Sequence, residues 1–103
     1  MKTKVIYTIL FLCMSANASI KEGESLFKEY CWGCHHQTSM AFGPSFQQIA
    51  NTRNSGEIIS HIADPKGTFA QLGYTRSVMP SFNTLSPEQL QALSDFIQSF
   101  KGQ

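Results

Sequence analysis

The chain has 103 residues, which is enough for one small domain, and 42% of them are hydrophobic. It contains no repeats, low-complexity tracts or linkers, so nothing in it predicts a second domain. The formal net charge is +1 at pH 7, and neither a basic run nor an acidic tail stands out. The charge pattern therefore predicts no nucleic-acid partner.

The first 18 residues have the pattern of an export signal. Lys2 and Lys4 give a positive start, and an apolar run follows from residue 5 to residue 14. Ala16-Asn17-Ala18 then provides the small-x-small site that a signal peptidase cleaves. We therefore expect residues 1–18 to be a cleaved signal peptide and the protein to reach the periplasm.

Cleavage would leave a mature domain of residues 19–103. It lowers the number of Lys and Arg residues from 8 to 6 against 7 Asp and Glu, which again argues against nucleic acid as a partner. The apolar run is shorter than the roughly 20 residues that a membrane-spanning helix needs, so no stable membrane anchor is expected. A retained N-terminal anchor is the alternative.

Both ends of the mature domain are predicted to be helical. Apolar residues recur at helical spacing from Gly23 to Tyr30. Near the other end, Ser86 is a candidate N-cap, and Gln89 completes a capping box with it. The apolar stripe of this second helix consists of Leu90, Leu93, Phe96, Ile97 and Phe100. Because Gly23 has no side chain, we expect it to let Phe96 or Ile97 approach the first helix closely.

The middle of the chain predicts two shorter helices and a long loop. One helical segment covers residues 46–50, and a second, capped by Asn54, ends before Asp64 and Pro65. Residues 66–84 include Gly67, Gly73 and Pro80 and are expected to form a loop. A loop of this length in so small a domain indicates that it wraps around something. No alternating strand pattern is present, so the predicted class is all-α.

One short motif carries chemistry. Cys31-Trp32-Gly33-Cys34-His35 is a C-x-x-C-H sequence, the pattern for covalent attachment of haem c. Two thiols three positions apart can bond to one edge of a porphyrin, and the adjacent imidazole of His35 can then ligate the iron. Export agrees with this interpretation, because free thiols outside the cytoplasm would otherwise form disulfides.

Three other interpretations of the cysteine pair compete with haem attachment. A C-x-x-C redox pair would normally lie near a βαβ pattern, which is not predicted here. A zinc site would have to combine the contiguous Cys34, His35 and His36, or recruit the distant His61 without finger spacing. A structural disulfide is the third alternative.

With these residues the chain resembles the small class I monohaem c-type cytochromes. The resemblance covers nearly all of the mature domain and adds Gly43-Pro44 and Met79-Pro80 to the cysteine motif. It implies an all-α fold of short helices around one covalently bound haem, a His and Met ligand pair, and electron shuttling between redox enzymes. It also implies that the carbonyl of Pro44 accepts a hydrogen bond from the proximal imidazole.

The second iron ligand can also be argued by elimination. Met1 and Met14 leave with the signal, and Met40 follows His35 too closely to reach the other face of a haem. Met79 remains, and Pro80 disfavours helix at Met79 and keeps the loop extended. His61 is the rival ligand, although a partly buried histidine or a partner of a haem propionate fits its place between Ile58 and Ile62 better.

The rest of the predicted pocket is less sharply defined. Many class I relatives place a Trp near a haem propionate, but the one Trp of this chain lies between the two cysteines. Arg53, Arg76 or His61 are the candidates for that role, and each could equally be an ordinary surface group. Tyr74 and Phe82 flank the Met79 loop and are expected to pack near the haem.

The expected function is single-electron transfer without catalysis by the protein itself. The expected partners are a donor dehydrogenase or reductase complex and an acceptor oxidase or peroxidase. Two alternatives remain open. One is a small cytochrome subunit of a periplasmic dehydrogenase, for example a sulfite-oxidising enzyme, which the segment from Ile62 to Phe82 loosely resembles. The other is a haem enzyme or gas sensor in which Met79 leaves the iron.

Overall fold

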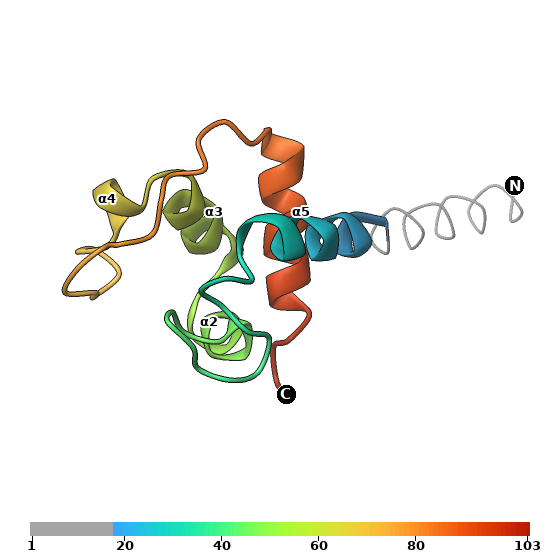
Figure 1. Ribbon diagram of the computed structural model, residues 1–103, viewed down its shortest axis with the longest axis horizontal. Helices are drawn as coiled ribbons and strands as arrows, with labels where there is room; N and C mark the ends of the chain where they lie inside the picture. The colour runs from blue at the N-terminus through green and yellow to red at the C-terminus, as the bar shows by residue number, and fades with distance from the viewer. Residues whose placement is uncertain (1–17) are drawn as a thin grey trace, which may run out of the picture.

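The computed structural model describes residues 18–103, and these residues are helical with no β-strand (Figure 1). The export signal predicted for residues 1–18 therefore lies outside the described residues, apart from Ala18. An N-terminal helix covers residues 18–30. The helices after it are α2 (Phe46–Thr52), α3 (Ser55–Ala63), α4 (Pro65–Thr68) and α5 (Pro87–Gln98). The predicted all-α class is confirmed. No helix within residues 18–103 is long and apolar enough to cross a membrane.

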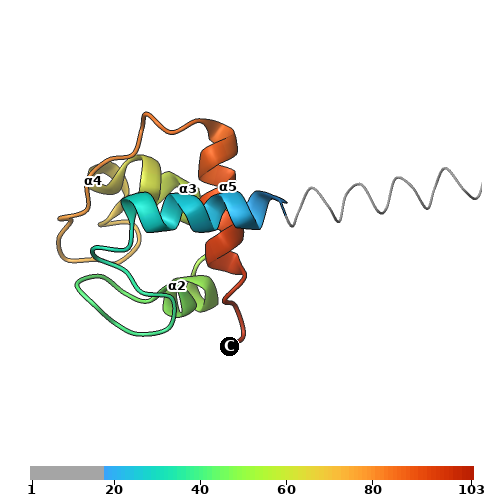
Figure 2. The ribbon, with the colours of Figure 1, turned by 45° about the vertical axis from the view of Figure 1, so that its right-hand side comes forward.

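The N-terminal helix crosses α5 in both views of the ribbon (Figures 1 and 2). The crossing lies at Gly23, where an added Cβ would be 2.7 Å from Phe96 Cβ and closer still to the Ala92 carbonyl. A glycine is therefore needed here, and the predicted approach of Phe96 is confirmed. The helix begins before Gly23, contrary to the prediction, because contacts with α5 extend it. The Ser19 hydroxyl, for example, donates to Asp95 at 2.7 Å.

The predicted N-caps are present. The Asn54 side chain accepts a hydrogen bond from the Glu57 N–H at 2.8 Å, and the Glu57 carboxylate accepts from the Asn54 N–H at 3.0 Å. Ser86 and Gln89 form the same reciprocal pair at the start of α5. These capping boxes fix the residues at which α3 and α5 begin. They thereby help to determine which side chains of each helix face the core.

The expected loop over residues 66–84 is wrong at its beginning, because α4 occupies Pro65–Thr68. The Asp64 side chain accepts from the Gly67 N–H at 3.1 Å, and Pro65 at the first position favours the helical backbone. A Cβ at Gly67 would meet the Asp64 carboxylate, so a larger residue there would displace this capping side chain. The chain from residue 69 to residue 86 contains no further helix.

Aromatic rings dominate the core. The Phe27 ring is fully buried, 4.9 Å from that of Phe46 and 5.5 Å from that of Phe96. The predicted stripe on α5 packs into this core, with Leu90, Leu93, Phe96 and Ile97 buried. The core ties the N-terminal helix, α2 and α5 together. Ile58 and Ile62 of α3 belong to this core and also border a cavity.

Candidate functional site

A mainly apolar cavity of about 300 Å³ lies between the cysteine motif, α3 and the chain that follows α4. Every residue that the sequence predicted for the haem site lines it. These residues are Cys31, Cys34, His35, Pro44, Arg53, His61, Tyr74, Arg76, Met79 and Phe82. Placement in one cavity shows that these side chains can meet a common ligand, while the role of each remains a prediction.

The cysteine motif forms a turn at the end of the N-terminal helix. The Cys31 N–H donates to the Phe27 carbonyl at 2.9 Å, and the His35 N–H donates to the Cys31 carbonyl at 3.0 Å. Both thiols are free, with Cys31 buried and Cys34 exposed. Burial, together with the neighbouring Cys34, raises the pKa of Cys31 to about 11. Burial therefore disfavours the thiolate of Cys31, which is the form in which a cysteine binds zinc.

The His35 ring is held in one orientation. Its Nδ1 lies 2.7 Å from the Pro44 carbonyl oxygen. Because a carbonyl can only accept, Nδ1 carries the proton and Nε2 keeps a free lone pair, which is the form that binds a metal. Gly43 allows this arrangement, since a Cβ there would lie 2.5 Å from His35 Cε1. This is the contact that the resemblance implied for Pro44.

Met79 reaches the cavity from a different segment of the chain. It is partly buried and packs against the hydrophobic core. The residues that follow it are anchored on α3: the Phe82 N–H donates to the Ile62 carbonyl at 3.1 Å, and the Ser81 hydroxyl to the Ala63 carbonyl at 2.6 Å. Met40, in contrast, is 74% exposed and does not line the cavity.

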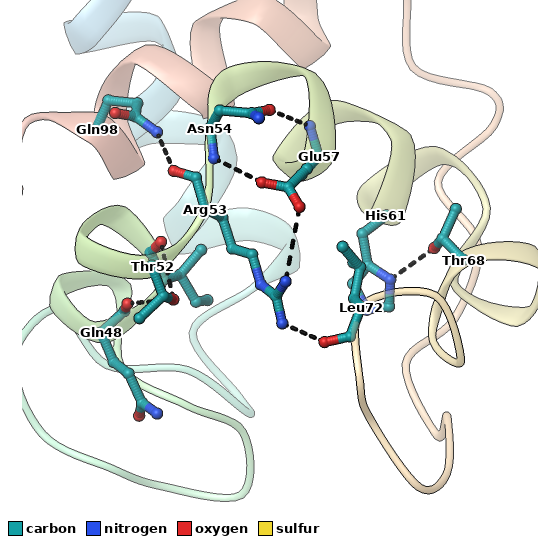
Figure 3. A network of polar contacts seen from close by, with 10 residues as sticks. Gln48, Thr52, Arg53, Asn54, Glu57, His61, Thr68, Leu72 and Gln98 are labelled. Atoms are coloured by element: carbon teal, nitrogen blue, oxygen red, sulfur yellow. Dashed lines mark hydrogen bonds and ion pairs between the residues drawn. The ribbon is translucent and has the colours of Figure 1, made fainter.

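Arg53 is the centre of a polar network beside the cavity (Figure 3). Its guanidinium donates to the Leu72 carbonyl and lies 3.6 Å from the Glu57 carboxylate. The guanidinium carbon is 5.3 Å from the centre of the Tyr74 ring, a cation–π contact. The Nε of Arg53 is buried and has no hydrogen-bond partner.

His61 is held by α4. Its Nδ1 lies 2.7 Å from the Thr68 hydroxyl, which itself donates to the Asp64 carbonyl at 2.8 Å. Because the Thr68 hydroxyl uses its one proton in the bond to Asp64, it must accept the hydrogen bond from His61. Nδ1 of His61 therefore carries the proton. Burial lowers the pKa of His61, and the charges of Arg53 and His35 lower it further. The lowered pKa favours the neutral imidazole of His61 at neutral pH. Arg76, the remaining candidate for a contact with a haem propionate, is exposed.

The sequence reasoning missed Ser77. Its hydroxyl is buried at the cavity wall and is the second side-chain atom within residues 18–103, besides Arg53 Nε, that is buried without a partner. No periodic pattern could have marked it, because it lies in an irregular segment. Trp32, between the two cysteines, is 49% exposed and stacks on Phe27.

These residues fit a haem. The apolar lining matches the porphyrin surface, and two free thiols, an imidazole and a thioether border the same space. Two buried donors without partners, Arg53 Nε and Ser77 Oγ, match the carboxylates that a haem carries. An empty apolar cavity would explain neither donor, whereas a ligand with an anionic edge explains both.

The comparisons with known proteins agree with this fit. The family model described as cytochrome c oxidase, cbb3-type, subunit III matches residues 18–97, which is most of the chain. No curated protein and no solved structure matches the chain. The chain therefore belongs to the family of cytochrome c oxidase, cbb3-type, subunit III, and is a c-type cytochrome domain of the kind that binds haem c and transfers electrons.

Proposed function

We propose that this protein is a periplasmic electron carrier with one haem, bonded covalently to Cys31 and Cys34 and ligated at the iron by His35 and Met79. The observation that carries the proposal is that these four side chains, which come from two separate segments of the chain, line one apolar cavity. The protein has no catalytic activity of its own in this proposal, because both axial positions of the iron are filled.

The bound haem would supply an iron that alternates between the ferric and ferrous states. The residues of the cavity prepare the surroundings of this iron. Pro44 keeps the His35 ring turned so that Nε2 is free to bind, and the apolar walls exclude water. A thioether ligand from Met79 and a buried site both favour ferrous iron. Arg53 Nε and Ser77 Oγ would donate to a haem carboxylate, which selects Arg53 over Arg76 for that role.

Electrons would pass at the surface next to the attachment turn, where Trp32, Gly33 and Cys34 are exposed. A carrier needs a small contact that separates quickly. The family name supports a terminal oxidase as the acceptor, with a dehydrogenase or reductase complex as the donor. The subunit of a sulfite-oxidising dehydrogenase is therefore the less favoured alternative.

The ligand assignment is tested by Met79→Ala. Haem should stay attached, because Cys31, Cys34 and His35 are unchanged. Loss of the thioether should lower the reduction potential, abolish the Met-to-iron band in the spectrum of the oxidised protein, and let cyanide bind more readily.

Met40→Ala is the matched control and should change none of these properties, because Met40 is exposed and lies outside the cavity. If Met79→Ala kept the spectrum and potential of the wild type while His61→Ala changed both, the site would be bis-histidine and the proposal would be wrong.

A further inference from the structure

The chain around Met79 is attached only at its two ends. Within the described residues, no hydrogen bond joins residues 75–80, here called the Met79 span, to any other part of the protein. Val78 is 62% exposed, so packing does not replace the missing hydrogen bonds there. Apart from the packing of Met79 itself against the hydrophobic core, the span is therefore held in place by the anchors at either side.

The downstream anchor belongs to α3. Ser81 and Phe82 are bonded to the last two residues of that helix, Ile62 and Ala63. The Phe82 ring also packs edge-on against Tyr30, with 5.8 Å between ring centres. This anchor consists of protein groups alone and does not involve a ligand of the cavity.

The upstream anchor is Arg53, which is 19 positions away from Leu72 in the sequence. Its guanidinium binds the Leu72 carbonyl (Figure 3). It also lies against the Tyr74 ring, just before the span begins. The other bonds of residues 69–74 are local turns, such as the one from the Tyr74 N–H to the Phe69 carbonyl at 2.9 Å. Arg53 is thus the hydrogen-bonded link between this end of the span and α3, whose Glu57 holds the guanidinium.

The same side chain also faces the ligand. Its Nε is buried at the cavity without a partner, which is a costly state for a charged group in a low-dielectric site. A haem carboxylate would satisfy this donor and fix the plane of the guanidinium. Because the guanidinium is rigid and planar, fixing Nε also fixes the two nitrogens that reach Leu72 and Glu57.

We propose that Arg53 couples binding of the anionic edge of the haem to closure of the Met79 span. Arg53 is a positioning residue here, since it acts on the iron ligand through Leu72 and Tyr74. The proposal rests on the proposed function, because it needs Met79 as a ligand, and it adds a way in which a bound haem would hold the span, and with it Met79, in place.

The test is imidazole binding to the oxidised holoprotein at saturating imidazole, where the rate reports how often Met79 leaves the iron. Arg53→Gln and Arg53→Lys should both raise this rate roughly tenfold or more, since each breaks a charged hydrogen bond to Leu72. The reduction potential should fall in Arg53→Gln, which loses a positive charge, and stay near the wild-type value in Arg53→Lys. If Arg53 only stabilised the fold, the imidazole rate and the reduction potential would not respond differently in the two variants.

Two control variants complete the experiment. Lys66→Gln removes an exposed positive charge on α4 and should change the imidazole rate by less than about twofold. Leu90→Ala creates a cavity in the core away from the haem pocket, so it should lower the melting temperature without changing the rate. If Leu90→Ala raised the rate as much as Arg53→Gln, general destabilisation would explain the effect and the coupling would be refuted.

Wild-type rates in Arg53→Gln, or a wild-type rate restored by Arg53→Lys, would also refute the coupling. Met79→Ala in the same assay separates this failure from that of the proposed function. If Met79→Ala binds imidazole much faster than the wild type, Met79 is a ligand and only the coupling fails. If it binds at the wild-type rate, the ligand assignment fails as well.

Discussion

The two segments that carry the proposed iron ligands are built differently. In residues 31–46, here called the attachment segment, hydrogen bonds tie the two ends of the segment to each other: Gly43 to Cys34 at 2.6 Å, Phe46 to His36 at 2.9 Å, and His35 to Pro44. The Met79 span has no such bonds between its two anchors. One cavity is therefore formed by a rigid wall and by a wall that can open.

This difference assigns different tasks to the two ligands. The attachment segment holds His35 through backbone bonds and would be tied to the haem by two covalent bonds in addition. Met79 is held by its anchors and would be held by the iron itself. Local opening should therefore release Met79 and leave His35 in place, because opening follows the part of the chain with the fewest internal bonds.

The largest expected effect comes from removing the proposed covalent attachment, which belongs to the rigid wall of the cavity. Cys31→Ser with Cys34→Ser should yield little folded protein, because a domain of this size with a cavity at its centre depends on its ligand. Circular dichroism and thermal melting after expression in the periplasm would measure this. A stable helical protein without haem and with cooperative melting would contradict the expectation.

A second change strains the rigid wall without removing any bond. Gly43→Ala would place a methyl group 2.5 Å from His35 Cε1, so the ring must turn or the loop must move. We expect a loss of about 1 to 3 kcal/mol in the free energy of unfolding, typical of overpacking, and altered ring signals of His35 in NMR spectra. Gly33→Ala is the matched control, since a Cβ there meets no atom within 4 Å. Equal effects of the two variants would show that His35 is not tightly held.

A third change loosens the downstream anchor of the Met79 span. Ser81→Ala removes the hydrogen bond to the Ala63 carbonyl and should cost about 0.5 to 1.5 kcal/mol of stability. Amide hydrogen exchange should become faster in residues 75–82 and stay unchanged in residues 31–46. Ser39→Ala, at an exposed position of the attachment segment, serves as the control. Faster exchange in both segments would mean that they open together.

The smallest expected effect concerns the surface of the rigid wall. Trp32→Phe keeps an aromatic ring to stack on Phe27 but reduces the exposed contact area. Electron transfer to the redox partner should slow by about two- to threefold, as for a modest loss of contact, while the reduction potential stays the same. Glu88→Gln, at the start of α5, should not alter the rate. A slower rate in Glu88→Gln but not in Trp32→Phe would place the contact surface elsewhere.

The sequence predicted those features that depend on neighbouring residues. The capping boxes at Asn54 and Ser86 and the cysteine motif are local patterns, and each was found where expected. The start of the N-terminal helix and the short α4 were missed, because contacts with α5 extend the first and a side-chain cap at Asp64 forms the second.

The network around Arg53 could not be predicted. It joins Arg53 to Leu72, which is 19 positions away, and the sequence alone left Arg53, Arg76 and His61 equivalent. The buried Ser77 hydroxyl was missed for the same reason, since burial in an irregular segment follows from the fold and not from a periodic pattern. Features that depend on tertiary contacts, such as these two, could be found only in the structure.

The crossing at Gly23 also has a consequence for the order of events during biosynthesis. Phe27, just before the cysteine motif, is buried against Phe96 of α5, so the helix that covers it is made after the cysteine motif. Contacts between such distant parts of a chain form late in folding. The two thiols therefore emerge in a chain whose core cannot yet close, which would leave them accessible for the proposed haem attachment until α5 packs across Gly23.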